Sequence, residues 1–185
     1  VDPAIDIDAL HFSELNKHTP PEAVAAMLSP LAEGQPVGVL SEAGCPAVAD
    51  PGADVVAVAQ RKGLRVVPLV GPSSILLAVM ASGFNGQRFA FHGYLPIEAD
   101  RRTHRIKELE ARIYAEDETQ LFIETPYRNG RLLEELIRIC RPSTRLCVAA
   151  NLTCEDEFVR TRPVKEWARN VPDLSHRPTI FAIYK

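Results

Sequence analysis

The residues with the clearest capacity for chemistry lie in a loop that follows a short apolar run. Residues 37–40 are typical of a buried strand, and the loop 41–45, Ser-Glu-Ala-Gly-Cys, comes directly after them. Its small residues let a ligand approach the backbone, while its serine and glutamate can bind polar groups. Open α/β sheets bind ligands beyond the carboxyl ends of their strands. The pattern therefore favours a binding site, and a tight turn without a ligand is the alternative.

Two helix starts follow this loop. The sequence 50–52, Asp-Pro-Gly, predicts a helix with Asp50 as its N-cap and a proline at its first position. Further on, the strand-like run 65–70 leads into a second helix, which Ser73 or Ser74 can cap. Because the first amides of a helix have no partner within it, they are free to bind a polar ligand group.

The elements that must position these loops follow from apolar periodicity. Helical spacing marks 20–31, 53–62, 73–81, 100–114 and 129–140, and strand-like runs occupy 37–40, 65–70, 89–91, 120–124, 145–149, 158–161 and 179–184. This alternation predicts an α/β fold with two lobes, each built on a mostly parallel or mixed sheet. A break near 83–88 predicts lobes at 1–84 and 85–185 with a cleft between them.

The composition excludes several classes of protein. Of 185 residues, 46% are apolar, which is enough for a sizeable core. The formal net charge is −3, so any RNA contact must come from a local patch. The four cysteines form no CxxC pair, which predicts reduced thiols in a cytoplasmic protein and no metal site. We see no apolar run of membrane-spanning length and no signal peptide.

The predicted helix 100–114 has two interpretations. It is a solvated amphipathic helix with Ile106, Leu109 and Ile113 facing the core, or it is a basic edge for RNA phosphates. The second interpretation depends on the five cations of this helix, which are Arg101, Arg102, Arg105, Lys107 and Arg112. Glu108 and Glu110 lower its net positive charge.

Taken in order, the motifs SEAGCP, DPG and VGPSS resemble those of the tetrapyrrole methylase family. Further along, Phe122, Glu124, Thr125 and Arg128 fit a family F-E-S-x-H-R pattern. The closest resemblance is to the branch that methylates a ribose 2′-hydroxyl in small-subunit ribosomal RNA. That branch typically has SDAGTP and PGP, so Glu42, Cys45 and Val70 are departures. An opening strand and loop of the family have no counterpart, so its N-terminal segment is expected to be missing.

The resemblance implies a cofactor, S-adenosylmethionine, and a set of residues that contact it. These are Ser41, Glu42, Ala43, Gly44, Cys45, Ser73, Ser74, Leu152 and Thr153. A ribose hydroxyl is a weak nucleophile and benefits from a base. Glu124 is the predicted catalytic residue, with Asp50 and His92 as further candidates. The alternatives are an ion pair of Glu124 with Arg128, a helix cap for Asp50 and a strand-end hydrogen bond for His92.

Three functions follow from the resemblance. The first is a ribosomal RNA ribose methyltransferase that acts on the RNA or on the small subunit. The second is a methylase of a small corrin- or tetrapyrrole-type acceptor, and the third is a family member that has lost catalysis. The family also implies a homodimer, with no contact to a membrane or a metal.

Overall fold

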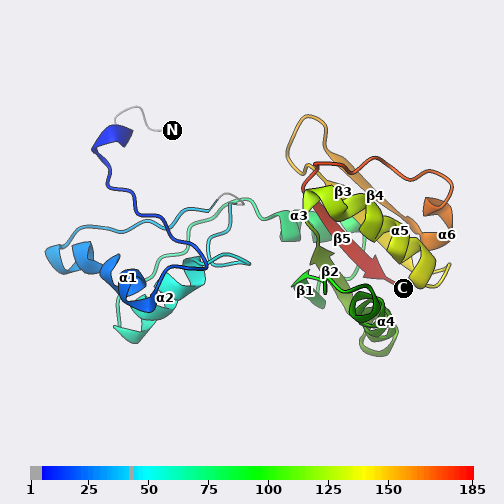
Figure 1. Cartoon of the computed structure of the whole chain (residues 1–185), viewed down its shortest axis with the longest axis horizontal. Coiled ribbons are helices and arrows are strands. Elements are labelled where there is room, and N and C mark those ends of the chain that lie inside the picture. Colours follow the sequence, from blue (N-terminus) through cyan, green and yellow to red (C-terminus); the bar gives the residue numbers. More distant parts are fainter. Residues whose placement is uncertain (1–5, 42–43) are drawn as a thin grey trace. The chain divides into compact units, whose positions relative to one another are not determined.

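The computed structural model describes residues 6–41 and 44–185 (Figure 1). The chain divides into two compact units, Val1–Pro72 and Ser73–Lys185. The helix α3 (Ser74–Ser82) packs against β3, β4 and β5 of the second unit. The predicted lobe boundary at residue 84 places this helix in the first lobe instead.

The second unit is built on one mixed sheet. Its strands are β1 (Phe89–Tyr94), β2 (Thr119–Ile123), β3 (Arg145–Ala150), β4 (Phe158–Pro163) and β5 (Thr179–Tyr184). Their order in space is β1-β2-β5-β3-β4. The pair β1–β2 is parallel and the other three pairs are antiparallel. The prediction of an α/β fold is confirmed by this unit.

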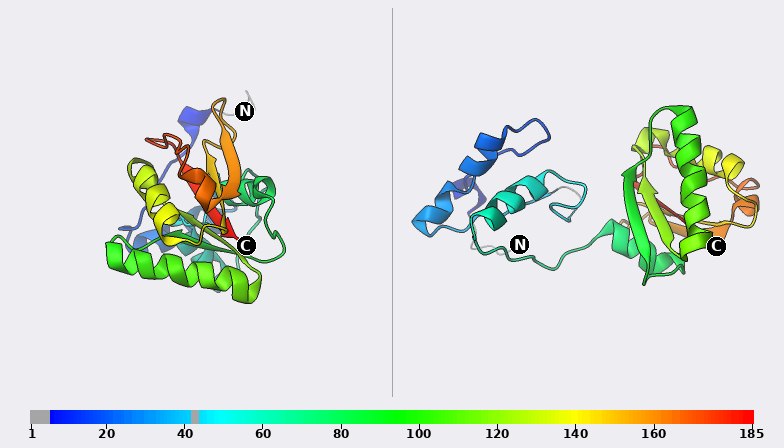
Figure 2. Two further views of the ribbon diagram at one scale, coloured as in Figure 1. Left: turned by 90° about the vertical axis from the view of Figure 1, so that its right-hand side faces the viewer. Right: turned by 90° about the horizontal axis from the view of Figure 1, so that it is seen from below.

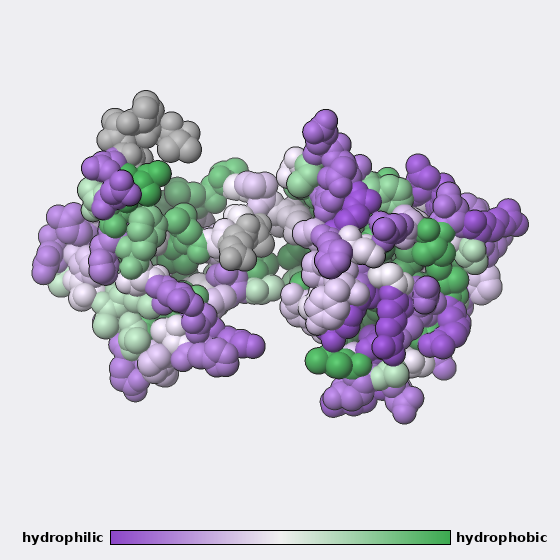
Figure 3. Space-filling view, turned by 45° about the horizontal axis from the view of Figure 1, so that its top comes forward, coloured by the Kyte–Doolittle hydropathy of each residue, from purple (hydrophilic) through white to green (hydrophobic). Residues whose placement is uncertain are grey.

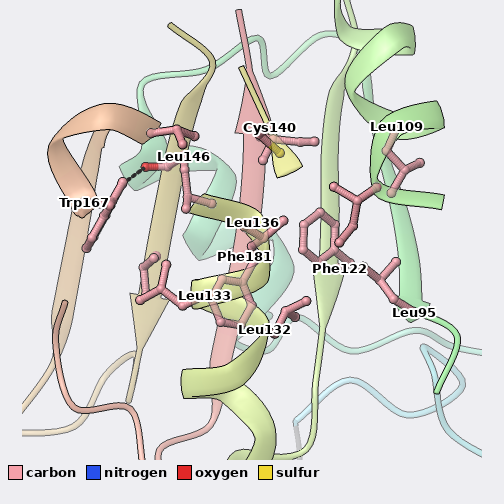
Figure 4. Close-up of a cluster of buried hydrophobic side chains, with 14 of the residues drawn as sticks. Leu95, Leu109, Phe122, Leu132, Leu133, Leu136, Cys140, Leu146, Trp167 and Phe181 are labelled. Carbon is pink, nitrogen blue, oxygen red and sulfur yellow. Dashed lines mark hydrogen bonds between the residues drawn. The ribbon is translucent and has the colours of Figure 1, made fainter. Parts of the chain in front are cut away.

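Helices cover both faces of the sheet. On one face lie α4 (Ala99–Glu116), α5 (Asn129–Ile139) and the short α6 (Val164–Trp167), and α3 packs on the other (Figure 2). The larger core forms under α4 and α5, where Phe122 and Phe181 stack with their ring centroids 6.1 Å apart. Trp167 is 1% exposed and its indole Nε1 donates to the carbonyl of Leu146 at 3.0 Å (Figure 4).

The first unit contains two α-helices, α1 (Pro21–Ala26) and α2 (Gly52–Arg61), and two 3₁₀ turns, Ile7–Ala9 and Ser29–Glu33. A small core joins α1 to α2, with Val24, Val55 and Val58 buried in it. Hydrophobic residues also remain at the surface of this unit (Figure 3).

The predicted strands 37–40 and 65–70 are wrong for the described residues. Residues 37–40 alternate as a strand does, because Val37 and Val39 pack on the small core while Leu40 is 81% exposed. In 65–70, Val66 alone packs on that core, and Leu69 is 88% exposed. A strand also needs a hydrogen-bonded neighbour. Among the described residues neither segment has one, so the first unit forms no sheet there.

Candidate functional site

The first unit brings two predicted binding loops into contact. Gly44 has a φ of +83°, and a Cβ on it would lie 3.1 Å from the carbonyl oxygen of Pro72. A Cβ on Gly71 would in turn lie 3.4 Å from the carbonyl oxygen of Gly44. The thiol of Cys45 donates to the same Pro72 carbonyl at 3.2 Å. The two loops therefore pack backbone to backbone, and glycine at 44 is required by both its conformation and its contact.

Other predicted residues of this loop have separate positions. Ser41 Oγ is buried and has no hydrogen-bond partner among the described residues. Glu42 and Ala43 lie outside the described residues. Asp50 Oδ1 accepts from the amides of Gly52 at 2.8 Å and Ala47 at 3.1 Å. The N-cap of α2 is Pro51, so Asp50 lies one residue before the predicted cap position, although its side chain accepts from the first amide of the helix.

In the second unit, strand direction gathers the candidate residues at one edge. Because β5 runs antiparallel to both β2 and β3, these two strands point the same way as β1 (Figure 1). Ile180 of β5 lies opposite both Ile123 of β2 and Ala149 of β3. Glu124 and Asn151 therefore follow two strands that end at the same edge, on the order of 10 Å apart.

Glu124 is held at this edge by one of its two carboxylate oxygens. Oε1 accepts from the Thr125 amide at 2.7 Å, the Thr125 hydroxyl at 3.2 Å and Arg128 Nη2 at 2.7 Å. The predicted ion pair with Arg128 is confirmed. Oε2 accepts no hydrogen bond from a described residue, although the residue is only 7% exposed. The side chain thus has a fixed orientation and one free oxygen.

A small pocket of about 70 Å³ adjoins this carboxylate, with room for a functional group rather than a whole cofactor. It is lined by Ile97, Arg102, Glu124, Arg128, Arg131 and Leu132. Tyr94, the register partner of Ile123, and Tyr127 are 60% and 70% exposed at the same end of the sheet.

Beneath the pocket lies a buried ion pair that sequence reasoning missed. Arg102 Nε and Nη2 donate to the two oxygens of Glu135 at 2.5 and 2.7 Å, and Nη1 donates to the carbonyls of Pro96 and Ile97. The hydrogen bond from Arg102 lowers the pKa of Glu135 below its usual value. This pair ties the segment after β1 to α5 and so shapes the pocket floor. The available signal was a glutamate on the apolar face of the helix 129–140.

The loop after β3 has strained backbone. Asn151 and Thr153 have φ values of 48° and 70°, a region that a β-branched residue rarely adopts. Asp156 accepts from the Asn151 side chain at 2.6 Å and Glu157 accepts from the Thr153 amide at 2.7 Å. Such conformations persist where surrounding contacts impose them, and they cluster at functional sites. Leu152 and Thr153 are placed at the same edge as Glu124.

Ser73 and Ser74 begin α3 as predicted. Ser73 is the N-cap, and its hydroxyl accepts from the Leu76 amide at 3.4 Å. Ser74 is the first residue of the helix.

His92 is bound on both ring nitrogens. Arg105 Nη2 lies 3.1 Å from Nδ1, and because a guanidinium can only donate, Nδ1 must accept. Nε2 then carries the proton and donates to Gln120 Oε1 at 2.7 Å. Burial, assisted by nearby Arg105, lowers the pKa of His92. These contacts confirm the interpretation of His92 as a strand-end hydrogen-bonding residue.

The helix α4 confirms the amphipathic interpretation of residues 100–114. Ile106, Leu109 and Ile113 are fully buried. Its cations are largely paired: Arg102 with Glu135, Arg105 with Glu108 at 2.8 Å, and Arg112 with Glu116 and Glu118. The helix therefore offers little free positive charge.

Comparison with known proteins identifies the family of this chain. The family model of the Tetrapyrrole (Corrin/Porphyrin) Methylases matches residues 7–168, most of the chain. The chain belongs to the tetrapyrrole methylase family. The resemblance seen in the sequence motifs is thereby confirmed.

Among relatives of this tetrapyrrole methylase chain is Ribosomal RNA small subunit methyltransferase I of Escherichia coli O157:H7. It is 33% identical over 152 residues, which cover 82% of this chain and 52% of that protein. The protein of the same name from Mesorhizobium japonicum is 33% identical over 153 residues, covering 83% and 51%. The chain spans about half the length of these curated relatives.

Solved structures confirm the fold of this tetrapyrrole methylase chain. The methyltransferase CobJ matches with a TM-score of 0.61 at 19% identity, over 89% of this chain and 71% of that one. Uroporphyrin-III C-methyl transferase from Thermus thermophilus, complexed with S-adenosyl homocysteine, matches with a TM-score of 0.52 at 20% identity, over 89% and 73%.

Residues 6–41 and 44–185 contain no cluster of three or more His, Cys, Asp or Glu side chains suited to a metal ion. In the same part of the chain, every helix is too short or too polar to cross a membrane.

The contacts of His92 predict a pH-dependent stability. The folded-state pKa is lowered, so the unfolded chain takes up a proton first as pH falls below the ordinary value of about 6.5. The contribution of His92 is present above that pH and is lost below it. Urea unfolding at pH 8 and pH 5.5 should show a smaller loss of stability for His92→Gln than for wild type. His104→Gln, which removes an exposed imidazole, is the control; equal losses in His92→Gln and wild type would contradict the prediction.

Proposed function

We propose that this chain forms part of an S-adenosylmethionine-dependent methyltransferase that methylates a ribose 2′-hydroxyl of small-subunit ribosomal RNA. The observation that carries the proposal is the 33% identity to ribosomal RNA small subunit methyltransferases over more than four-fifths of the chain. The motifs in that span are those on which the site is built.

The residues of the first unit fit a cofactor of this kind. S-adenosylmethionine carries its own electrophile, a methyl group on a sulfonium, so the protein's task is mainly to position it. Gly44 and Gly71 allow the two loops to pack backbone to backbone, and Ser41 offers a buried hydroxyl. We assign Ser41, Gly44 and Cys45 to cofactor binding.

Further cofactor contacts are proposed in the second unit. Ser73 and Ser74 begin a helix, and the strained loop carries Leu152 and Thr153. Glu42 and Ala43 complete the proposed set, which comes from the family resemblance.

At the acceptor side, Glu124 is proposed as the base. Its Oε1 is anchored by Thr125 and Arg128, so Oε2 stays in one orientation and can take the proton of a hydroxyl. The exposed rings of Tyr94 and Tyr127 offer faces on which unstacked bases of an RNA can stack. The guanidinium of Arg128 lies 5.4 Å from the Tyr127 ring centroid. Arg128 therefore contacts both the Tyr127 ring and the Glu124 carboxylate.

The proposal is tested with the full-length protein, radiolabelled S-adenosylmethionine and small ribosomal subunits that lack the native modification. Label in a ribose of the RNA supports it. Cofactor binding without label would redirect the function to a small acceptor such as a tetrapyrrole. No binding and no label would identify a family member that has lost catalysis.

Gly44→Ala should weaken cofactor binding. The added Cβ would lie 3.1 Å from the Pro72 carbonyl and would force the two loops apart. Gly34→Ala is a matched control, because Gly34 has a similar φ of +77° but no atom within 4 Å of its ideal Cβ. Calorimetry should show at least a roughly tenfold larger dissociation constant for Gly44→Ala, about 1.4 kcal/mol, and little change for Gly34→Ala. Equal affinities in the two variants would remove this loop from the site.

Glu124→Gln should lower the turnover number about 100-fold or more without changing cofactor affinity, since it removes the base but keeps an oxygen for Thr125 and Arg128. The control is Glu108→Gln, which breaks an exposed ion pair with Arg105. Single-turnover methylation separates the two roles of Glu124. A purely structural role would lower the stability to urea and leave the methylation rate unchanged.

A further inference from the structure

A cluster of positive charge lies on β4, on α6 and in the segments that follow α5 and α6. Its members are Arg141, Arg160, Arg162, Lys165 and Arg169, which we call the basic patch. Segments 138–145 and 158–170 contain one acidic residue, Glu166. Within the described part of the chain, none of the five cations forms an ion pair. This concentration contrasts with the net charge of −3 for the whole sequence.

Backbone contacts bring these two segments together. The Val164 amide donates to the Thr144 carbonyl at 2.8 Å, and the Lys165 amide donates to the Pro142 carbonyl at 3.2 Å. In the β3–β4 pair, Pro163 lies opposite Arg145. The cations from both segments therefore share one end of the second unit.

Strand geometry aligns two of these arginines. Arg160 and Arg162 are two residues apart on β4, so they project from one face with a separation of about 7 Å. That separation is comparable with the distance between neighbouring phosphates along an extended nucleic-acid strand. The face is the one covered by α5 and α6, since Phe158 packs on its core.

Aromatic rings lie beside the two guanidinium groups. Arg160 lies 5.5 Å from the ring centroid of Phe158, and Arg162 lies 5.7 Å from that of Trp167. A cation at this distance from a ring is attracted to it, which limits the motion of a long side chain. The N–H groups of a guanidinium match two oxygens of a phosphate, so arginine is suited to bidentate contacts.

Part of the patch lies at the opposite end of the sheet from Glu124. Pro163, at the end of β4, pairs with the first residue of β3, whereas the candidate site follows the last residue of β3. Arg162 pairs with Leu146 near the first of these ends, and Arg160 pairs with Val148 midway along the strand. A six-residue strand spans about 20 Å. A ligand that reaches from Glu124 to Arg162 must therefore be extended, as a nucleic-acid strand is.

We propose that the basic patch is a second RNA contact, which binds phosphates of the substrate RNA at up to about 20 Å from the proposed methylation site. The inference rests on the proposed function. In this inference, the basic patch strengthens RNA binding through charge. The edge of the sheet that carries Glu124 selects the nucleotide to be methylated.

The test uses the full-length protein and a small-subunit RNA fragment, with binding measured between about 50 and 200 mM salt. In the triple variant Arg160→Gln, Arg162→Gln, Lys165→Gln, the slope of log affinity against log salt should fall by about 2, with roughly tenfold weaker binding at low salt. A matched triple variant removes three exposed cations elsewhere that likewise form no ion pair with a described residue: Lys17→Gln, Lys62→Gln and Lys107→Gln. It should keep the wild-type slope.

A second variant separates charge from packing. Arg160→Lys with Arg162→Lys keeps both charges but loses the planar stacking, and it should retain most of the salt slope. If this variant loses RNA binding as fully as the glutamine triple, packing rather than phosphate contact explains the effect and the inference is overturned.

Failure of this inference differs from failure of the proposed function. If wild type methylates RNA but the glutamine triple keeps the wild-type slope, the patch is not an RNA contact. If the triple loses binding to whole subunits but not to bare RNA, the patch contacts an acidic protein and the inference is again overturned. If wild type neither binds nor methylates RNA while it binds the cofactor, the proposed function itself fails.

Discussion

The direction of three strands is the constraint on which the second unit depends. β1, β2 and β3 run the same way, and parallel strands need long crossover connections, here supplied by α4 and α5. Those helices cover one face of the sheet and create the larger core. The same direction sends the segments after all three strands to one edge. Glu124 and Thr153 lie at the same edge because of topology, not because of sequence proximity.

The polar groups at this edge are arranged by charge pairing in partly buried surroundings. Breaking one partner of a buried ion pair typically costs about 3–5 kcal/mol, because it leaves an uncompensated charge. Arg102 also satisfies two carbonyls and Glu135 also accepts from Arg131, so the pair fixes the segment after β1 in one position. In a similar way, the ion pair with Arg128 holds Oε1 of Glu124 in one position. Fixed carboxylates and strained loops at one edge are consistent with a site that positions its reactants.

Much of the second unit could be predicted from periodicity, because its strands and helices have partners within the chain. The run 37–40 has the same apolar character as 145–149, yet only the latter becomes a strand. Apolar pattern measures the tendency to be buried, whereas a strand also requires a neighbour with free amides and carbonyls. A glutamate on the apolar face of the helix 129–140 indicates a buried partner, but the local sequence does not identify that partner as Arg102, which is 33 residues away. The cofactor residues stay a prediction that comes from the family motifs.

We propose that the loops 41–45, 71–74 and 151–153 bind S-adenosylmethionine. Ultraviolet cross-linking of the radiolabelled cofactor to the full-length protein, followed by peptide mapping, tests this most directly. We expect label in peptides that contain these loops. That label should be lost when unlabelled S-adenosyl homocysteine competes with the cofactor for binding. Competable label confined to α4 or to the basic patch would contradict it.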